Sequence, residues 1–216
     1  MIYVKKSAGT NLIPLLKTAQ KKNNEKVYRE GLVYEQIKTD FYEKCYLCED
    51  NEVTSIQIEH FEPHKNDMTK KYAWSNIFYS CGHCNNIKGA DFWPLLNCTD
   101  ADDQAWESIE IRFTPFPKAT INLQLSSTCT KTPEGNNTLN LLDKILTGTN
   151  ATPMKIDEAA TLRKKMLRAY NQLSKAIVNQ DIDAIKDCIA DKSAFAGMLR
   201  WHLKIYFPEL FDKAIF

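Results

Sequence analysis

Two short cysteine pairs constrain the fold of this sequence more than any other feature. Cys45 and Cys48 form one Cys-x-x-Cys pair, and Cys81 and Cys84 form a second. Two such pairs can supply four thiolates to one tetrahedral Zn²⁺, provided that the insert between them folds as a unit and returns to the metal. A redox dithiol needs only one pair, so we favour zinc over a redox motif. The sequence therefore predicts a structural zinc site.

The cellular compartment can be inferred from the start of the chain and from its hydropathy. The first residues lack the apolar core of a signal peptide, and no apolar run is long enough to cross a bilayer. We therefore expect a cytoplasmic protein, in which thiols stay reduced and a disulfide framework is disfavoured. The cysteines without a partner at ligand spacing are expected to be small buried residues: Cys98, Cys129 and Cys188.

Histidines are rare in the chain but gather around the cysteine pairs. Of the four histidines, His60 and His64 lie in "IEHFEPH", and His83 lies inside the second pair, in "CGHCNNIKG". Between these stretches, "YAWSNIFYS" leads into the second pair. In order, the chain carries Glu59-His60, Asn76-Ile77, Cys81-Gly-His-Cys84-Asn85 and Lys88.

This order of residues resembles the HNH endonuclease family, whose catalytic unit is a ββα fold around one divalent metal. The family pattern has Asp-His, then Asn before an aliphatic residue, then Cys-x-x-Cys followed by His or Asn, and Lys three residues on. The chain departs from the pattern at Glu59, where the family usually has Asp. "CYLCE", "IEHFEPHK" and "WSNIFYSCGHCNNIKG" most resemble PtuB, the HNH nuclease subunit of Septu-type and retron-associated anti-phage systems. That resemblance implies an effector nuclease with an ATPase partner resembling PtuA.

The resemblance and the chemistry of phosphodiester cleavage together suggest catalytic roles. His60 is expected to be the general base, because neutral imidazole is available near pH 7. Asn76 is expected to fix the loop backbone beside it. The side-chain oxygens of Glu59 and Asn85 are expected to hold a catalytic Mg²⁺ or Mn²⁺, which prefer such ligands.

The substrate phosphate would be contacted by Lys88 and His64. His64 is equally consistent with an alternative metal ligand or a plain surface histidine. Neighbours in a strand point to opposite faces, so Glu59 and His60 can serve one site only where the strand ends or twists, and Pro63 is compatible with such an end.

The fold class expected is α+β and mostly helical, with a zinc-stabilised ββα-metal unit followed by a helical C-terminal region. We place an HNH nuclease domain at residues 1–130, with its core motif at 45–89, and the helical region at 131–216. "SIEIRFTPF" and "TINLQLSS" alternate apolar and polar residues and predict strands, and "IYVKK" predicts a short one. Gly148 is expected to end one helix, and Pro153 to begin the next.

The overall charge limits how the chain holds its substrate. A net charge of +1 gives no global field toward nucleic acid, so affinity is expected to come partly from a partner. The apolar tail, residues 200–216, is a candidate docking segment whose deletion should leave the protein folded, with simple self-packing as the alternative. The competing function is a zinc-stabilised nucleic-acid or protein binding module without catalysis. The sequence does not distinguish DNA from RNA as substrate.

Overall fold

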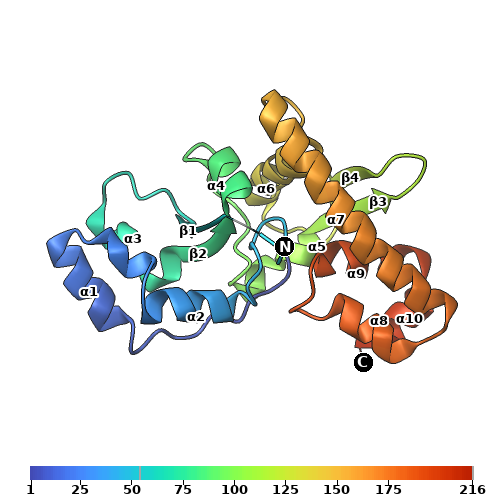
Figure 1. The fold of residues 1–216 in the computed structure, drawn as a ribbon, viewed down its shortest axis with the longest axis horizontal. Helices are drawn as coiled ribbons and strands as arrows, with labels where there is room; N and C mark the ends of the chain where they lie inside the picture. The colour runs from blue at the N-terminus through green and yellow to red at the C-terminus, as the bar shows by residue number, and fades with distance from the viewer. Residues whose placement is uncertain (54, 216) are drawn as a thin grey trace.

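In the computed structural model, residues 1–53 and 55–215 are described. The described chain is mostly helical with small two-stranded sheets, as the sequence predicts (Figure 1). The helices are α1 (Ile13–Lys22), α2 (Leu32–Asp40), α3 (Met68–Lys71), α4 (Gly82–Lys88), α5 (Ala105–Ser108), α6 (Thr132–Thr147), α7 (Pro153–Val178), α8 (Ile182–Ile189), α9 (Ala196–Tyr206) and α10 (Pro208–Ile215). The strands are β1 (Ile56–His60), β2 (Ile77–Cys81), β3 (Ile109–Thr114) and β4 (Thr120–Leu125). Short 3-10 turns are η1 (Glu25–Tyr28), η2 (Trp74–Asn76) and η3 (Ala101–Asp103).

Local signals in the sequence set several helix ends. Gly148 follows α6 with a φ of 78°, a left-handed conformation that glycine adopts without a Cβ penalty. Pro153 opens α7, where its fixed φ suits the first helical position. Asp181 caps α8, because its carboxylate accepts a hydrogen bond from the Ala184 amide at 3.0 Å.

The first residues form no strand, contrary to the prediction for "IYVKK". Residues 2–6 run as a partly buried segment without a sheet partner in the described chain. The Val4 amide donates to the Cys98 carbonyl at 2.8 Å, and the apolar side chains of Ile2 and Val4 are buried. Apolar alternation therefore marks burial here and not sheet pairing.

β1 and β2 are antiparallel, with His60 opposite Ile77 and Glu59 opposite Phe78. α4 follows β2 without a loop, and it packs on both strands. The sulfur of Cys81 caps α4, because it accepts a hydrogen bond from the Cys84 amide. Strand and helix are thus joined at the second cysteine pair, next to α1–α3 at one end of the molecule (Figure 1).

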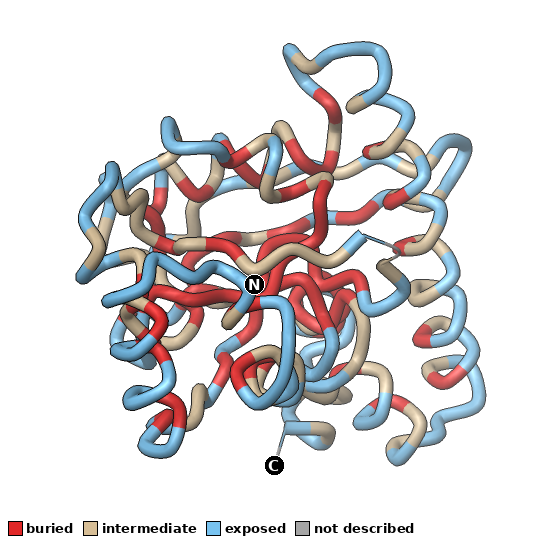
Figure 2. Tube along the Cα trace, turned by 60° about the vertical axis from the view of Figure 1, so that its left-hand side comes forward, coloured by how far each residue is buried: buried red, intermediate tan, exposed pale blue. Residues whose placement is uncertain are grey.

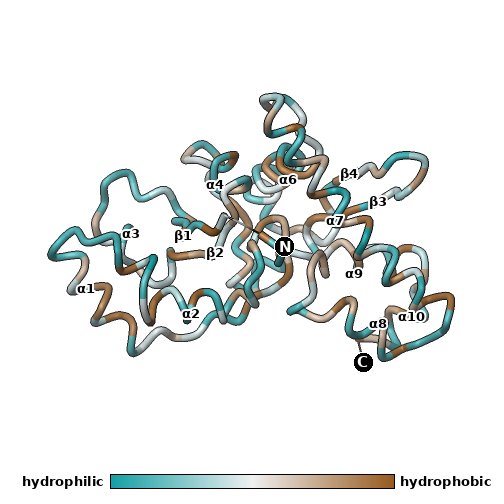
Figure 3. Tube along the Cα trace, in the orientation of Figure 1, coloured by the Kyte–Doolittle hydropathy of each residue, from teal (hydrophilic) through white to brown (hydrophobic). Residues whose placement is uncertain are grey.

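β3 and β4 form the second sheet, which lies among the C-terminal helices. α9 packs on β3, α6 packs on β4, and α7 contacts both α6 and α8. Buried residues concentrate through the middle of the molecule, where these elements meet (Figure 2). Hydrophobic and hydrophilic positions alternate along the outer helices, as expected for helices with one buried face (Figure 3).

The boundary predicted near residue 130 falls just before α6. Buried side chains on both sides of it, such as Phe113 and Leu142, belong to one hydrophobic cluster. The division at this point stays a prediction. No helix in the described part of the chain is long and apolar enough to span a membrane.

The apolar tail belongs largely to the core. In α9, Trp201 is 5% exposed and Leu203 is fully buried. The Trp201 indole also donates to the Trp106 carbonyl at 2.8 Å. The expectation that residues 200–216 can be removed from a folded protein is therefore corrected, because part of this segment supports β3. The last residue, Phe216, lies outside the described residues.

Candidate functional site

The four paired cysteines meet in one buried cluster. Cys45 and Cys48 lie in the turn after α2, Cys81 ends β2, and Cys84 lies in the first turn of α4. Their sulfur atoms all lie within 4.8 Å of one another. The Cys48 and Cys81 sulfurs are 3.9 Å apart, whereas Zn–S bonds of about 2.3 Å in a tetrahedron place sulfurs roughly 3.8 Å apart. The donor set and its size therefore fit Zn²⁺.

His83 lies inside the second cysteine pair but points away from the cluster. Its Nδ1 is 2.5 Å from the Glu158 carboxylate of α7, and its Nε2 donates to the Ile145 carbonyl of α6 at 3.0 Å. His83 thus ties the cysteine cluster to the C-terminal helices, and it lies outside the set of four sulfur ligands.

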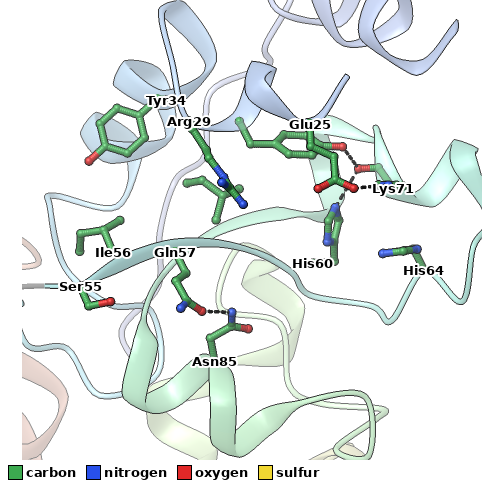
Figure 4. Close-up of a pocket in the computed structure, with 12 residues that line it drawn as sticks. Glu25, Arg29, Tyr34, Ser55, Ile56, Gln57, His60, His64, Lys71 and Asn85 are labelled. Carbon is green, nitrogen blue, oxygen red and sulfur yellow. Dashed lines mark hydrogen bonds and ion pairs between the residues drawn. The ribbon is translucent and has the colours of Figure 1, made fainter. Parts of the chain in front are cut away.

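A cleft of about 690 Å³ runs along the free edge of β1. One wall is β1 with the start of α4, and the other is η1 with the start of α2 (Figure 4). The lining residues are Glu25, Tyr28, Arg29, Tyr34, Ser55, Ile56, Gln57, Ile58, His60, His64, Lys71 and Asn85. Of the predicted site residues, the cleft therefore brings together His60, His64 and Asn85.

His60 is half-buried at the end of β1. Its Nε2 lies 2.9 Å from the Lys71 carbonyl. A carbonyl oxygen only accepts, so Nε2 carries the hydrogen and Nδ1 keeps its lone pair. Burial lowers the pKa of His60, and the hydrogen bond to Lys71 opposes that shift only in part. The ring is thus neutral near pH 7 and able to accept a proton at Nδ1.

Asn76 is buried and holds the loop that follows His60. Its Oδ1 accepts from the Glu62 amide at 2.7 Å. Its Nδ2 donates to the carbonyls of Glu62 at 3.0 Å and Lys70 at 3.1 Å. These bonds fix both ends of the loop, and so they place the Lys71 carbonyl that contacts His60.

Glu59 and Lys88 occupy different positions from those the prediction requires. Glu59 lies on the face of β1 opposite His60 and is 4% exposed. Its Oε1 is 2.6 Å from the Lys88 ammonium, and it accepts from the Tyr46 hydroxyl at 3.1 Å. Lys88 is 1% exposed and also donates to the His60 carbonyl at 3.1 Å. Lys88 therefore joins α4 to β1 and does not reach the cleft, which corrects its expected contact with phosphate.

Burial raises the pKa of Glu59 to about 7, although the Lys88 ammonium opposes this shift. The second oxygen of Glu59, Oε2, is buried without a hydrogen-bond partner in the described chain. An unpartnered buried carboxylate oxygen is costly, and a cation would satisfy it. Strand alternation explains why Glu59 and His60, adjacent in sequence, face different surroundings.

The Asn85 side chain points from α4 toward the cleft, where its Nδ2 donates to Gln57 Oε1 (Figure 4). This bond leaves the Asn85 amide oxygen for other partners. His64 stands beside His60, with ring centroids 4.7 Å apart, and its Nδ1 accepts from the Asn66 amide. The cleft therefore offers an amide oxygen and two imidazoles along one wall.

The comparisons with known proteins bear on this region. Residues 45–91 match the HNH endonuclease family model. The match contains the cysteine cluster, β1, β2 and α4, and it supports the family resemblance for this part of the chain. The searches of curated proteins and of solved structures gave no match. An HNH domain indicates a nuclease-type function, while the closer resemblance to PtuB stays a prediction.

Sequence reasoning missed the second wall of the cleft. Tyr28, Arg29 and Glu25 lie outside residues 45–91 and come from η1 and its end. Arg29 is exposed and extends toward the cleft in Figure 4. No local pattern distinguishes these residues in the sequence, since their importance arises from packing against residues about forty positions away.

Proposed function

We propose that the chain is a metal-dependent endonuclease that hydrolyses phosphodiester bonds in nucleic acid. The observation that carries this proposal is His60, a neutral imidazole on the cleft whose Nε2 is held by the Lys71 carbonyl. This arrangement is what a general base requires, because the ring is oriented and one nitrogen keeps its lone pair. The HNH match over residues 45–91 supports the same reaction.

In the proposed reaction, His60 Nδ1 takes a proton from a water molecule whose oxygen attacks the scissile phosphorus, while the P–O bond to the leaving oxygen breaks and that oxygen takes a proton from solvent. Asn76 keeps the loop in place, so the Lys71 carbonyl continues to orient the ring as the proton arrives. The same carbonyl stabilises the imidazolium, because its hydrogen bond strengthens when the ring becomes charged.

Asn85 is the proposed cleft-side ligand of the catalytic ion, and Glu59, which faces the other side of β1 in this structure, would have to turn from Lys88 toward the cleft to join it. Asn85 lines the cleft, and Glu59 keeps Oε2 without a partner in the described chain. Oxygen donors of this type suit Mg²⁺ or Mn²⁺. A divalent ion bound there supplies Lewis-acid stabilisation of the phosphate and the leaving oxygen.

Basic side chains on the cleft take over the contact first expected of Lys88. His64 and Arg29 line the cleft, and Lys71 is already paired with Glu25 at 2.5 Å. Arg29 is therefore the proposed partner of a substrate phosphate, and His64, next to His60, is a second proposed contact.

The finer proposal concerns the biological setting and rests on the sequence resemblance. We propose an effector nuclease of an anti-phage defence complex, with an ATPase partner resembling PtuA, in the cytoplasm. The near-neutral net charge of +1 supports a partner, because a nuclease that holds nucleic acid alone usually carries more positive charge.

The central experiment measures cleavage of plasmid, single-stranded DNA and tRNA by the purified protein, with and without Mg²⁺ or Mn²⁺. His60→Ala should lose at least ~10²-fold in rate, the low end of general-base contributions. The control variant is Lys164→Ala, on the exposed face of α7. A histidine control at His202 is unsuitable because His202 packs against the aromatic rings of Tyr170 and Tyr206. A zinc-loaded wild-type protein that binds nucleic acid but cleaves none of these substrates would favour the binding module.

A further inference from the structure

The Lys71 carbonyl accepts a second hydrogen bond besides that from His60. Lys71 ends α3, and carbonyls in the last turn of a helix lack partners within it. The Tyr28 hydroxyl donates to this oxygen at 2.5 Å, while His60 Nε2 lies 2.9 Å from it. Tyr28 and His60 therefore share one acceptor, although they are far apart in the sequence.

The Tyr28 ring also contacts His60 directly. The two rings meet edge to face, with centroids 5.6 Å apart and an angle of 84°. Tyr28 is 6% exposed and stacks on Tyr72 at 5.4 Å, so packing fixes its position. A fixed aromatic ring limits the rotation of the imidazole and excludes water from one side of it.

The side chain of Lys71 is held by the same N-terminal region. Its ammonium is 2.5 Å from Glu25 Oε1 and 3.2 Å from Asn23 Oδ1. The backbone oxygen of Lys71 is thus fixed from η1 by Tyr28, and its side chain by Glu25. The other bonds near the carbonyl are made by neighbouring groups, such as the Lys71 amide to the Asp67 carbonyl and Asn76 to the Lys70 carbonyl.

We propose that Tyr28 is a positioning residue for His60, acting through the Lys71 carbonyl from a segment outside the HNH match. This inference rests on the proposed nuclease function, in which His60 is the base. Tyr28 sets the orientation of the imidazole by holding the Lys71 carbonyl that accepts from its Nε2, and Glu25 supports it by holding Lys71. The N-terminal region is therefore part of the active site and not only a cover for the HNH domain.

The test in activity uses Tyr28→Phe, which removes the hydroxyl and keeps the ring. Because one hydrogen bond contributes about 1 kcal/mol, kcat should fall about 5-fold while KM stays within about 2-fold. Tyr42→Phe removes a hydroxyl from an exposed position outside the cleft lining and serves as the matched control. Wild-type kcat in Tyr28→Phe, or a change in KM alone, would overturn the proposal.

A double-mutant cycle separates positioning from general support of the fold. In the His60→Ala background, Tyr28→Phe should cause no further loss of rate, because the residue it orients is gone. An equal loss in both backgrounds would show that Tyr28 acts by another route. Glu25→Gln, at an exposed position, provides a second variant should Tyr28→Phe fold poorly, with an expected loss of about 3-fold in kcat.

A readout independent of cleavage keeps this proposal distinct from the proposed function. Nitrogen NMR of the imidazoles at pH 8, assigned with His60→Ala, should show His60 with its hydrogen on Nε2 in the wild type. Tyr28→Phe should shift the His60 Nε2 signal, because the geometry of its hydrogen bond to the Lys71 carbonyl changes when the Tyr28 hydroxyl no longer holds that oxygen, and Tyr42→Phe should not. Unchanged His60 signals in Tyr28→Phe would overturn the positioning role, whereas absent cleavage with the expected NMR change would overturn only the nuclease function.

Discussion

At the scale of single residues, the pair of Glu59 and Lys88 has the clearest energetic consequence. Both side chains are nearly inaccessible to water, and the ammonium lies 2.6 Å from the carboxylate. Removing one partner leaves a buried charge without compensation. The pair therefore links β1 to α4, whatever role Glu59 has toward a metal.

Glu59→Gln should accordingly lower the free energy of unfolding by about 3 kcal/mol, the low end for breaking a buried pair. Glu59→Gln combined with Lys88→Met should recover most of this loss, since no buried charge then remains unpaired. Urea unfolding of the zinc-loaded proteins measures the free energy of unfolding of the single and the double variant. Single and double variants of equal stability would show that the pair is not formed in solution.

The pH dependence of cleavage tests the protonation state of His60. Burial lowers its pKa from 6.5, and the base form is the unprotonated ring. kcat/KM should therefore rise with pH through an apparent pKa below 6.5 and stay level above it. Measurement from pH 5 to 8.5 at saturating Mg²⁺ gives the profile. A rise in kcat/KM centred near pH 7 would instead indicate that Glu59 is the titrating group, because burial raises its pKa to about 7.

At the scale of elements, the cysteine cluster connects the turn after α2 to the junction of β2 and α4, segments that are more than thirty residues apart in the sequence. β1 and β2 have five residues each, so the unit has little core of its own. A closed four-thiolate site would then contribute directly to its folding, because zinc binding free energy adds to folding free energy.

Purified protein should contain about one zinc per chain, and Cys84→Ser should lose it. The variant should show a lower melting temperature and faster amide exchange in β1, β2 and α4. Cys188→Ser, on α8 and outside the cluster, is the matched control and should keep zinc. A Cys84→Ser protein that melts like the wild type would show that the cluster is not a structural metal site.

The sequence predicts the elements of this region better than their contacts. The strand at Glu59-His60 and the cysteine positions follow from alternation and spacing, which are local properties, whereas β2 is buried along its whole length and shows no alternation. The partner of Lys88 and the wall formed by Tyr28 are not predictable in this way. They depend on which surfaces meet in the folded chain. The sequence "EKVY" of η1 contains no motif that predicts a contact with His60.

At the scale of the whole molecule, the C-terminal helices differ in how much they support the core. α9 supplies Met198, Leu199, Trp201 and Leu203, each no more than 5% exposed. α10 has no buried residue among those described, and it packs on α8 and α9 through partly buried side chains such as Leu210 and Phe211. The tail therefore has two parts: α9 belongs to the core, and α10 lies at the periphery.

A chain ending at residue 206 should therefore fold, bind zinc and melt at a modestly lower temperature than the full chain. A chain ending at residue 199 should be insoluble, because loss of a buried tryptophan alone costs about 3–5 kcal/mol, a large part of a domain's total stability. Solubility, zinc content and melting temperature distinguish the two. The 206-residue chain is also the one to test for binding the proposed ATPase, since lost binding in a folded protein would assign the interface to α10. A soluble, zinc-loaded chain ending at 199 would show that α9 is not needed beneath β3.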